Sequence, residues 1–293
     1  MFGARFCSDM ERDGVSWASR LFGTVGCFTR KCFFRILSLG PIPTHIAFIL
    51  DGNRRYAQKW NLKEGDGHKA GFLALMSLVK YCYEMGFEYT TIFAFSIDSF
   101  RRRPDEVQYV MDLMLEKIEG MLREESILTE YGVRVCFIGN LKLLNQAARV
   151  AAEKAMMATV NNTKAVLLIC VAYTSSDEIT HAVEESCKEK WAKIQALNAS
   201  RAFNGMTQLV ELEGSGEKQE QQHPIIKLTD LEKHMYMGVA PDRDILFRTS
   251  GVTHLSNFLL WQTTNCILYS PAALWPEADQ PVYPAKLPIQ IWV

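Results

Sequence analysis

One stretch of the chain, THIAFILDGNRRY over 44–56, constrains the fold more than any other. Its apolar run from Ile46 to Leu50 is typical of a strand that is buried on both faces of a parallel sheet. The run breaks into the polar loop from Asp51 to Arg55. Ligands of open α/β sheets bind beyond the carboxyl ends of the strands, where this loop would lie. The stretch therefore predicts an α/β fold with a ligand site at this strand end.

The loop residues have the chemistry of a metal-diphosphate site. Asp51 offers a hard oxygen ligand for Mg²⁺, and Gly52 lets backbone approach a ligand closely. Asn53 supplies an amide, while Arg54 and Arg55 supply forked cationic donors suited to phosphate oxygens. The same residues also suit a polar turn in which Asp and Asn bond their own backbone. Both interpretations stay open on these residues alone.

Strand and helix patterns alternate along the rest of the chain, as expected for one α/β domain with a mostly parallel sheet. Further strands are predicted over 89–95, 133–138, 165–172, 244–247 and 266–269. Helices are predicted after 64–71, from Pro104 onward, and over 141–159, 177–197 and 258–261.

Three more polar segments are candidates for binding anions. EGDGHKAG (64–71) leads into a helix, where N–H groups and His68 would face an anion. SIDSFRRRP (96–104) follows a strand, and its arginines form either an anion clamp or a solvated charge run. RTSGVTHLSN (248–257) combines an arginine, small hydroxyls and a glycine at a strand exit, the composition of an anion nest. Together these loops predict two anionic substrates and one metal ion.

Composition limits the class of protein. The chain is 48% apolar and 22% charged, so it is an ordinary globular protein. Its net charge of -1 gives no general field for nucleic acid, and any anion site must be local. The eight cysteines are scattered without a CxxC pair, which predicts reduced core residues in the cytosol and no zinc site.

The two ends and one internal segment differ from the body. Residues 1–43 carry apolar and basic residues at near-helical spacing, which suits either a membrane-interface helix or a helix docked on protein. No apolar run of about 18 residues predicts a transmembrane helix. Residues 198–224 are predicted to be a mobile polar insertion, and 278–293 form an atypical proline-rich tail.

Several separated motifs together resemble the signatures of the cis-prenyltransferase family of undecaprenyl and dehydrodolichyl diphosphate synthases. They are HIAFILDGNRRYA (45–57), GHKAG (67–71), AFS (94–96), RTSG (248–251), LSNFLLWQ (255–262) and LWPE (274–277). The resemblance covers about Gly40 to Glu277 in the right order. It is closest to the plant dehydrodolichyl and rubber-type enzymes.

The resemblance implies a catalytic domain over 44–277, with a central, mostly parallel sheet flanked by helices and a hydrophobic product tunnel. It implies repeated cis-condensation of isopentenyl diphosphate onto an allylic diphosphate such as farnesyl diphosphate. An accessory prenyltransferase subunit or a second copy of the chain is the expected protein partner. The expected location is the cytosolic face of the endoplasmic reticulum with peripheral membrane contact, or else the free cytosol.

The resemblance also implies roles for individual residues. Asp51 would bind Mg²⁺ and act in catalysis, together with Asn53 and Ser99. The remaining matched positions would bind substrate: Gly52, Arg54, Arg55, Tyr56 and His68 on the allylic side, Phe100 near the prenyl groups, Arg102, Arg248 and Ser256 on the isopentenyl side, and Ser96 and His254 beside them.

Three departures from the family pattern support a competing hypothesis. Many members have Asn at the place of Ser99, and most have Glu and Arg at the places of Val252 and His254. The lost arginine is a bidentate phosphate donor that histidine replaces poorly. The chain is therefore either an active long-chain cis-prenyltransferase or a non-catalytic relative that acts as a binding subunit of a prenyltransferase complex.

Overall fold

The structure is a computed structural model that describes residues 43–122, 131–207 and 225–279, without the side chains of Glu64 and of 201–207. Six strands form a single sheet: β1 (His45–Ile49), β2 (Tyr89–Ser96), β3 (Val133–Ile138), β4 (Ala165–Tyr173), β5 (Ile245–Arg248) and β6 (Ile267–Tyr269). Their order is β3-β4-β2-β1-β5-β6, and every neighbouring pair is parallel. The predicted α/β fold is confirmed.

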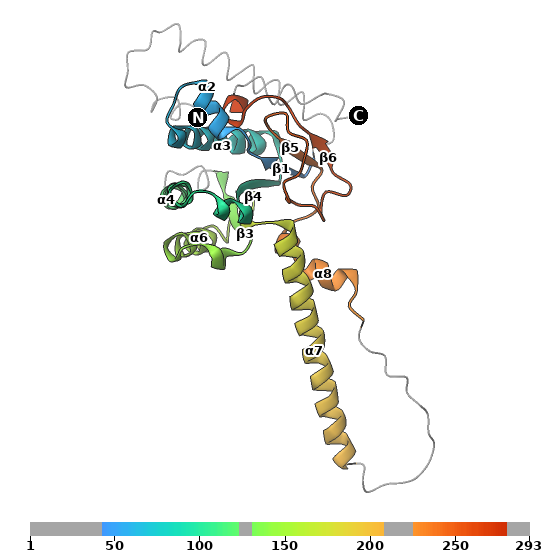
Figure 1. Cartoon of the computed structure of the whole chain (residues 1–293). Coiled ribbons are helices and arrows are strands. Elements are labelled where there is room, and N and C mark those ends of the chain that lie inside the picture. The colour runs from blue at the N-terminus through green and yellow to red at the C-terminus, as the bar shows by residue number, and fades with distance from the viewer. Residues whose placement is uncertain (1–42, 123–130, 208–224, 280–293) are drawn as a thin grey trace.

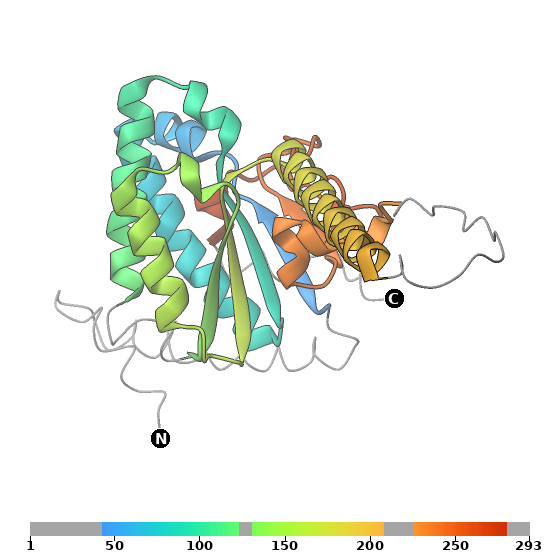
Figure 2. The same cartoon turned by 90° about the horizontal axis from the view of Figure 1, so that it is seen from below.

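Helices cover both faces of this sheet (Figures 1 and 2). The α-helices are α2 (Asn53–Lys59), α3 (Glu64–Met85), α4 (Pro104–Met121), α6 (Gln146–Ala158), α7 (Ser175–Thr207) and α8 (Leu228–His234). Short 3₁₀ helices are η1 (Ile97–Arg101), η2 (Leu141–Leu143), η3 (Tyr236–Val239) and η4 (Trp275–Asp279). Helices α3, α4 and α6 lie on one face, and α7 and α8 lie on the other (Figure 2).

The core lies on both faces of the sheet because alternate side chains of a strand point to opposite sides. On the α3 and α4 face, Leu167 of β4 belongs to a cluster with Val79 and Met111. On the other face, Leu168 of the same strand belongs to a cluster with Met237 and Phe258. This double burial explains why the strand sequences are almost continuously apolar.

The strand order places a switch point between β1 and β5. The chain leaves β1 toward β2 on one side, and it returns much later to form β5 on the other side. Connections that diverge from two adjacent parallel strands leave a crevice at the carboxyl ends of these strands. Asp51 follows β1 and Arg248 ends β5, so both lie at this crevice.

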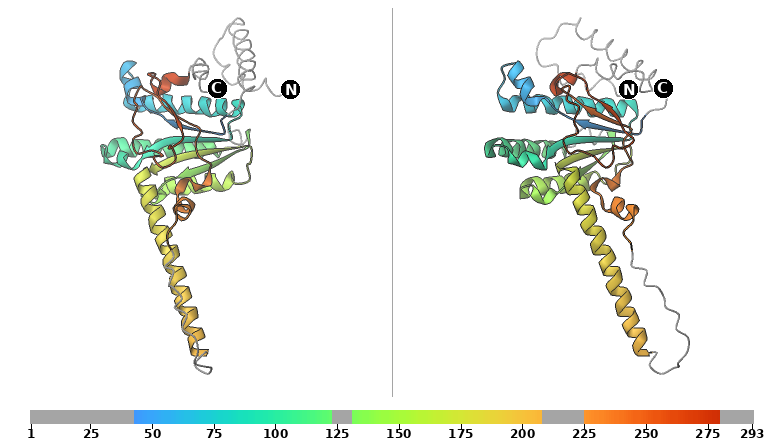
Figure 3. Two further views of the ribbon diagram at one scale, coloured as in Figure 1. Left: turned by 90° about the vertical axis from the view of Figure 1, so that its right-hand side faces the viewer. Right: turned by 45° about the vertical axis from the view of Figure 1, so that its right-hand side comes forward.

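Helix α7 extends well beyond the sheet (Figures 1 and 3). It has 33 residues and continues to Thr207. The predicted end of this helix at 197 is therefore wrong, and the first ten positions assigned to the polar insertion are helical. They lack glycine and proline until Gly205, so nothing in the local sequence stops the helix at 197.

The predicted helix over 258–261 is also wrong. The segment forms successive turns, with positive φ at Ser256, Asn257 and Leu259. The apolar run in this segment reflects burial, since Phe258 and Leu259 are fully buried. The strand predicted at 266–269 is confirmed as β6.

The ends of the chain and much of the insertion, residues 1–42, 208–224 and 280–293, lie outside the described residues. Among the helices that are described, none is long and apolar enough to cross a membrane. The five described cysteines are unpaired: Cys82 and Cys170 are buried, Cys136 and Cys266 are partly buried, and Cys187 is exposed on α7.

Candidate active site

Asp51 and Arg248 form an ion pair at the switch point of the sheet. Arg248 Nη2 donates to Asp51 Oδ2 at 2.8 Å, although the two residues are 197 positions apart. Arg55, one turn into α2, donates to the other oxygen at 3.2 Å and to Ser250 Oγ at 2.6 Å. Two arginines from different segments thus hold one carboxylate.

The electrostatics of this cluster keep Asp51 ionised. Burial raises the pKa of its carboxyl group, but the hydrogen bonds and charges of Arg248 and Arg55 outweigh burial, so the pKa is lowered overall. Because Asp51 is ionised, its carboxylate oxygens can bind a metal ion. The arginines are then available to phosphate oxygens.

The backbone of the Asp51 loop is fixed by hydrogen bonds from two sides. The Thr249 hydroxyl donates to the Asp51 carbonyl at 2.7 Å, and the Asp51 N–H donates to Thr249 Oγ1 at 2.9 Å. The Trp275 N–H donates to the same carbonyl at 3.0 Å, and the Trp275 indole donates to the Gly71 carbonyl at 2.8 Å. Gly52 has φ +117°, a value that L side chains rarely adopt. Trp275 belongs to the LWPE motif, so this motif helps to hold the Asp51 loop.

A polar cavity of about 460 Å³ opens over the loop. It gathers side chains from the end of β1, α2, α3 and the segment after η1. The lining residues are Leu50, Asp51, Gly52, Asn53, Arg54, Arg55, Gln58, His68 and Arg102. Seven of the sequence-predicted site residues thus surround one space.

The three successive arginines have separate environments. Arg101 and Arg103 are exposed and lie near Asp98 and Asp105, as in a solvated charge run. Arg102 lines the cavity and donates to Glu106 Oε1 at 2.9 Å. The same oxygen lies 3.8 Å from Arg54 Nη1. Glu106 was missed by the sequence reasoning, although its i,i+4 spacing from Arg102 is a signal for such a pair.

The prediction that residues 64–71 form an approach to a later helix start is wrong. Helix α3 already begins at Glu64, so Gly67, His68 and Gly71 lie within it. A Cβ on Gly67 would lie 2.4 Å from the Asn53 carbonyl oxygen, and one on Gly71 would lie 2.1 Å from Asn53 Oδ1. These glycines therefore let α3 approach Asn53 closely, which places His68 at the cavity.

Arg248 also organises the loop that follows β5. Its Nη1 donates to Ser256 Oγ at 2.7 Å and to the His254 carbonyl at 2.5 Å. His254 Nδ1 lies 3.0 Å from Ser256 Oγ. The backbone contributes little to the predicted anion nest, because the Ser250 and Gly251 N–H groups donate to the carbonyls of Ala273 and Pro271. Anion binding here depends on the side chains.

The turn that carries Ser256 is held by the junction of β4 and α7. Ser175 donates its N–H to the Asn257 carbonyl at 2.7 Å, and its Oγ accepts from the Leu260 N–H at 2.9 Å. Glu178 is fully buried and accepts from Gln262 Nε2 at 2.9 Å. The polar strand exit at 173–177 thus supports the neighbouring loop, a role that the sequence reasoning missed because no local pattern reports it.

Four predicted residues lie around the site without lining the polar cavity. Ser96 caps η1, with its Oγ accepting from the Asp98 N–H at 3.1 Å. Ser99 is buried in η1, and Phe100 packs edge-on against Phe95 at 5.0 Å. Tyr56 lies on α2 with its ring 6.3 Å from that of Trp60.

An apolar cavity of about 160 Å³ adjoins the polar one. Leu50, Asn53 and His68 line both spaces, so the polar and apolar cavities are neighbours. The apolar walls lie between the sheet and helices α3 and α4. They include Phe72, Leu75, Val110, Met114, Ile118, Met121, Phe137, Ile169 and Val171. Lys117 also lies there, with Nζ 5.1 Å from the centroid of Phe72.

This arrangement of a guanidinium-bound carboxylate near an apolar cavity agrees with what comparisons with known proteins show. A family model described as putative undecaprenyl diphosphate synthase matches residues 49–285. The chain belongs to the undecaprenyl diphosphate synthase family of cis-prenyltransferases. Among curated relatives, a dehydrodolichyl diphosphate synthase of Solanum lycopersicum is 56% identical over 268 residues, covering 92% of this chain and 91% of that one.

Two further comparisons extend this result. A rubber cis-polyprenyltransferase of Hevea brasiliensis is 56% identical over 257 residues, covering 88% of this chain and 87% of the relative. The fold matches that of lavandulyl diphosphate synthase from Lavandula x intermedia in complex with dimethylallyl diphosphate. That match has a TM-score of 0.63 at 22% identity over 80% of this chain and 89% of the other. The family predicted from the sequence motifs is confirmed.

The donor set of this cis-prenyltransferase fits a substrate-bridged magnesium ion. In the described part of the chain, no group of three His, Cys, Asp or Glu side chains converges on a metal position. Mg²⁺ in proteins is often held by one or two carboxylates together with substrate phosphates. Asp51 lines the polar cavity, and Asn53 Oδ1 is a buried acceptor there with no partner among the described residues. These oxygens suit the ion once diphosphate is present.

Proposed function

We propose that the chain is a Mg²⁺-dependent, long-chain cis-prenyltransferase that condenses isopentenyl diphosphate repeatedly onto an allylic diphosphate such as farnesyl diphosphate. The observation that carries the proposal is the Asp51–Arg248 pair beside a polar cavity that adjoins an apolar one. A diphosphate needs the first space and a prenyl chain needs the second. The names of the plant relatives describe the same chemistry.

Each part of the site has a task in that reaction. The bond between the allylic carbon and its diphosphate breaks, a carbon–carbon bond to the isopentenyl unit forms, and a proton is released. Mg²⁺, when bound through Asp51, supplies charge that stabilises the departing diphosphate. Arg55, Asn53 and His68 orient the allylic diphosphate, and their fixed donors stabilise the charge that develops on it.

The isopentenyl diphosphate side is assigned to Arg248, Ser256 and Arg102. Support comes from Arg248 Nε, a buried donor without a hydrogen-bond partner among the described residues. Arg102 is held beside the cavity by Glu106, which a diphosphate would replace as the acceptor. Both arginines therefore have donors to give to a second anion.

The growing hydrocarbon is assigned to the apolar cavity between the sheet and α4. Met114 and Met121 are flexible side chains that adjust to a ligand of changing length. Val110, Met114, Ile118 and Met121 line this space at helical spacing, so one stripe of α4 faces it.

A second function, as a non-catalytic subunit, is favoured by the isopentenyl side alone. His254 offers one ring nitrogen near Ser256 where the family pattern has a bidentate guanidinium. Ser99 offers no amide. If these changes abolish turnover, the intact Asp51 cluster still binds diphosphate, and the chain acts through a partner.

A protein partner or a second copy is supported by α7. Val183, Trp191 and Leu197 are exposed on this helix, so it carries apolar surface that a partner would cover. We further propose peripheral location at the cytosolic face of the endoplasmic reticulum, because a long polyprenyl product is insoluble in water and requires a membrane.

The test measures incorporation of labelled isopentenyl diphosphate onto farnesyl diphosphate with Mg²⁺, with and without a co-expressed accessory subunit, and sizes the products by chromatography. Long products that Asp51→Ala abolishes are expected. A folded protein that gives no product with the partner present, yet binds farnesyl diphosphate, would contradict the enzyme assignment and favour the binding subunit.

A further inference from the structure

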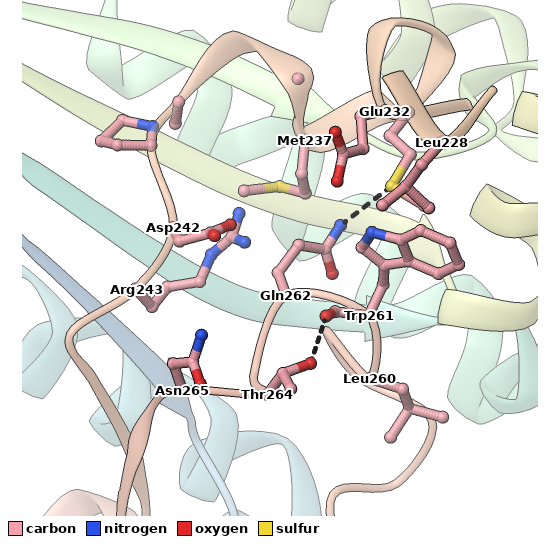
Figure 4. A pocket seen from close by; sticks show the side chains of 14 residues that line it. Leu228, Glu232, Met237, Asp242, Arg243, Leu260, Trp261, Gln262, Thr264 and Asn265 are labelled. Carbon is pink, nitrogen blue, oxygen red and sulfur yellow. Dashed lines mark hydrogen bonds between the residues drawn. The ribbon is translucent and has the colours of Figure 1, made fainter. Parts of the chain in front are cut away.

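A cavity of about 810 Å³ lies beside α8, η3 and the turns at 260–265, and it shares no lining residue with the two cavities of the active site (Figure 4). Arg243 and Gln262 are among its lining residues. The Arg243 Nε and Nη2 atoms and the Gln262 Oε1 atom have no hydrogen-bond partner among the described residues, but each exposes less than 1 Å². A molecule in this cavity therefore cannot reach these atoms.

A contact with consequences for ligand binding joins α4 to the first turn of α3, and these two helices lie on the same face of the sheet (Figure 2). The Tyr109 hydroxyl of α4 donates to the Gly65 carbonyl of α3 at 3.0 Å. The centroid of the Tyr109 ring lies 6.5 Å from that of the His68 ring, with 48° between the ring planes. His68 lines both the polar and the apolar cavity, whereas Tyr109 is not among the lining residues of either. Tyr109 therefore reaches the site through His68.

Gly65 makes room for this contact. A Cβ atom at position 65 would lie 2.6 Å from both Cζ and Oη of Tyr109, which is closer than real Cβ atoms approach other atoms. The φ of Gly65 is not in the left-handed region that favours glycine. Alanine is also a better helix former than glycine. The packing of Tyr109, and not the helix backbone, therefore explains glycine at this position.

The first turns of α3 are held from two sides. With about 100° between successive helical residues, Gly65 and Gly67 point about 200° apart around the helix axis. Gly67 faces Asn53 of α2, because a Cβ there would lie 2.4 Å from the Asn53 carbonyl oxygen. Gly65 faces Tyr109 of α4. His68 points between these two directions, so the contacts with α2 and α4 together fix where its imidazole meets the cavities.

Tyr109 projects from a part of α4 that is tied to the rim of the polar cavity. Glu106, three residues earlier and thus on the same side of the helix, accepts from Arg102 Nη1 at 2.9 Å. The Glu106 carboxylate also lies 3.8 Å from Arg54 Nη1, and its side chain is only 9% exposed. Arg54 and Arg102 both line the polar cavity. These contacts anchor the start of α4 at the site and give Tyr109 a fixed base.

We propose that Tyr109 is a positioning residue for the allylic diphosphate, because it holds His68 in place at the polar cavity. This role rests on the proposed function, in which His68 orients that diphosphate. A polar group binds a ligand best when its geometry is fixed before the ligand arrives. Loss of the Tyr109 contact therefore weakens the binding of the allylic substrate without removing a group that touches it.

The test is calorimetric titration of the full chain with farnesyl diphosphate and Mg²⁺, without isopentenyl diphosphate, so that binding is measured in the absence of turnover. Tyr109→Ala is expected to weaken binding about fivefold, and Tyr109→Phe, which keeps the ring but loses the hydrogen bond to Gly65, about twofold. Gln108→Ala is the matched control and leaves binding unchanged, since Gln108 is an exposed neighbour whose amide donates to Asp112 on the same helix.

The wild-type and Tyr109→Ala titrations also separate the failure of this role from the failure of the proposed function. Equal binding of farnesyl diphosphate by the two proteins would overturn the role of Tyr109 alone. A folded wild-type protein that does not bind farnesyl diphosphate would overturn the proposed function together with it.

A double-mutant cycle tests whether Tyr109 acts through His68. In a His68→Ala background, Tyr109→Ala is expected to cause no further loss of binding, because the side chain that it positions is absent. A loss of the same size as in the wild-type background would show that Tyr109 acts on the ligand by another route, and it would overturn the proposal.

Gly65→Ala separates positioning from a general structural role. The added methyl group displaces the Tyr109 phenol, while alanine favours the helix. Farnesyl diphosphate is expected to bind about fivefold more weakly, although the unfolding temperature stays the same or rises. A parallel fall in affinity and unfolding temperature would indicate a structural role, and unchanged affinity would show that the contact does not affect the ligand. Either result would overturn the proposal.

Discussion

The two ends of β5 carry buried arginines in opposite circumstances. At the carboxyl end, the Nη atoms of Arg248 donate to Asp51, Ser256 and the His254 carbonyl. At the amino end, Arg243 makes no hydrogen bond to another described residue through Nε or Nη2. The comparison shows that the chain itself supplies the partners of the Arg248 Nη atoms, whereas two donors of Arg243 have no partner among the described residues.

The surroundings of the two arginines explain the difference. Near Arg248, the carboxylate of Asp51 lies just after the end of the adjacent strand β1. Near Arg243, the same strand begins with His45, whose pKa is lowered to about 4 by burial and by the charge of Arg243. His45 is therefore neutral, and its ring nitrogens form hydrogen bonds with the Thr91 hydroxyl and the Pro241 carbonyl. The neutral ring of His45 adds no second positive charge beside Arg243. Both ring nitrogens are already in hydrogen bonds, so the ring offers Arg243 no acceptor.

The largest effect on activity is expected when the Asp51 partner of Arg248 is removed. Asp51→Ala should lower kcat by about a thousandfold or more, because it removes both the metal ligand and the partner of two arginines. Steady-state incorporation of labelled isopentenyl diphosphate measures this. Asp51→Asn serves as a matched variant of equal size that keeps the loop packed. An Asp51→Ala protein with wild-type turnover would refute the assignment of Asp51.

A smaller effect is expected when the hydrogen bonds that support the Ser256 turn are weakened. Glu178→Gln places an amide against three donors, so KM for isopentenyl diphosphate should rise about tenfold, equivalent to ~1.4 kcal/mol, while KM for farnesyl diphosphate changes little. Glu185→Gln, partly exposed on the same helix, is the control. Equal increases in both KM values would instead indicate a general loss of packing.

An added phosphate donor near Arg248 is expected to improve the binding of isopentenyl diphosphate. His254→Arg restores a bidentate phosphate donor beside Ser256, so KM for isopentenyl diphosphate should fall about fivefold. The variant is measured with Val252→Glu and alone, since both positions depart from the family pattern. Unchanged kinetics would argue against isopentenyl binding at His254 and place any defect elsewhere.

The smallest effect concerns the contact between α7 and α8. Lys193, then His234 and Lys233, lower the pKa of Glu189 to about 2, and the last two tie α8 to α7. A lowered acid pKa stabilises the fold above the unfolded value near 4.3, and this contribution disappears as pH falls toward 2. Glu189→Gln should therefore lower the unfolding temperature slightly at pH 7, and the difference should shrink in acid. A difference independent of pH between 7 and 2 would contradict this.

The sequence alone determined the local part of this protein. Periodicity marked β1, β2, β3 and β4 almost to the residue, because alternation and burial leave a local signature. The break from Ile49 into Asp51 identified the principal site loop, and separated motifs identified the family.

Tertiary structure alone decided which distant groups meet. Gly71 is required by contact with Asn53, and the N–H groups of Ser250 and Gly251 are occupied by carbonyls of 271–273; each relation links segments that no local pattern connects. The turns at 256–259 appeared helical in sequence because burial against Phe93 and Tyr173 requires the same apolar residues as a helix face. Whether Arg243 lies in solvent or under a cavity was likewise set by packing, since a single charged residue before a strand has no periodicity to report its burial.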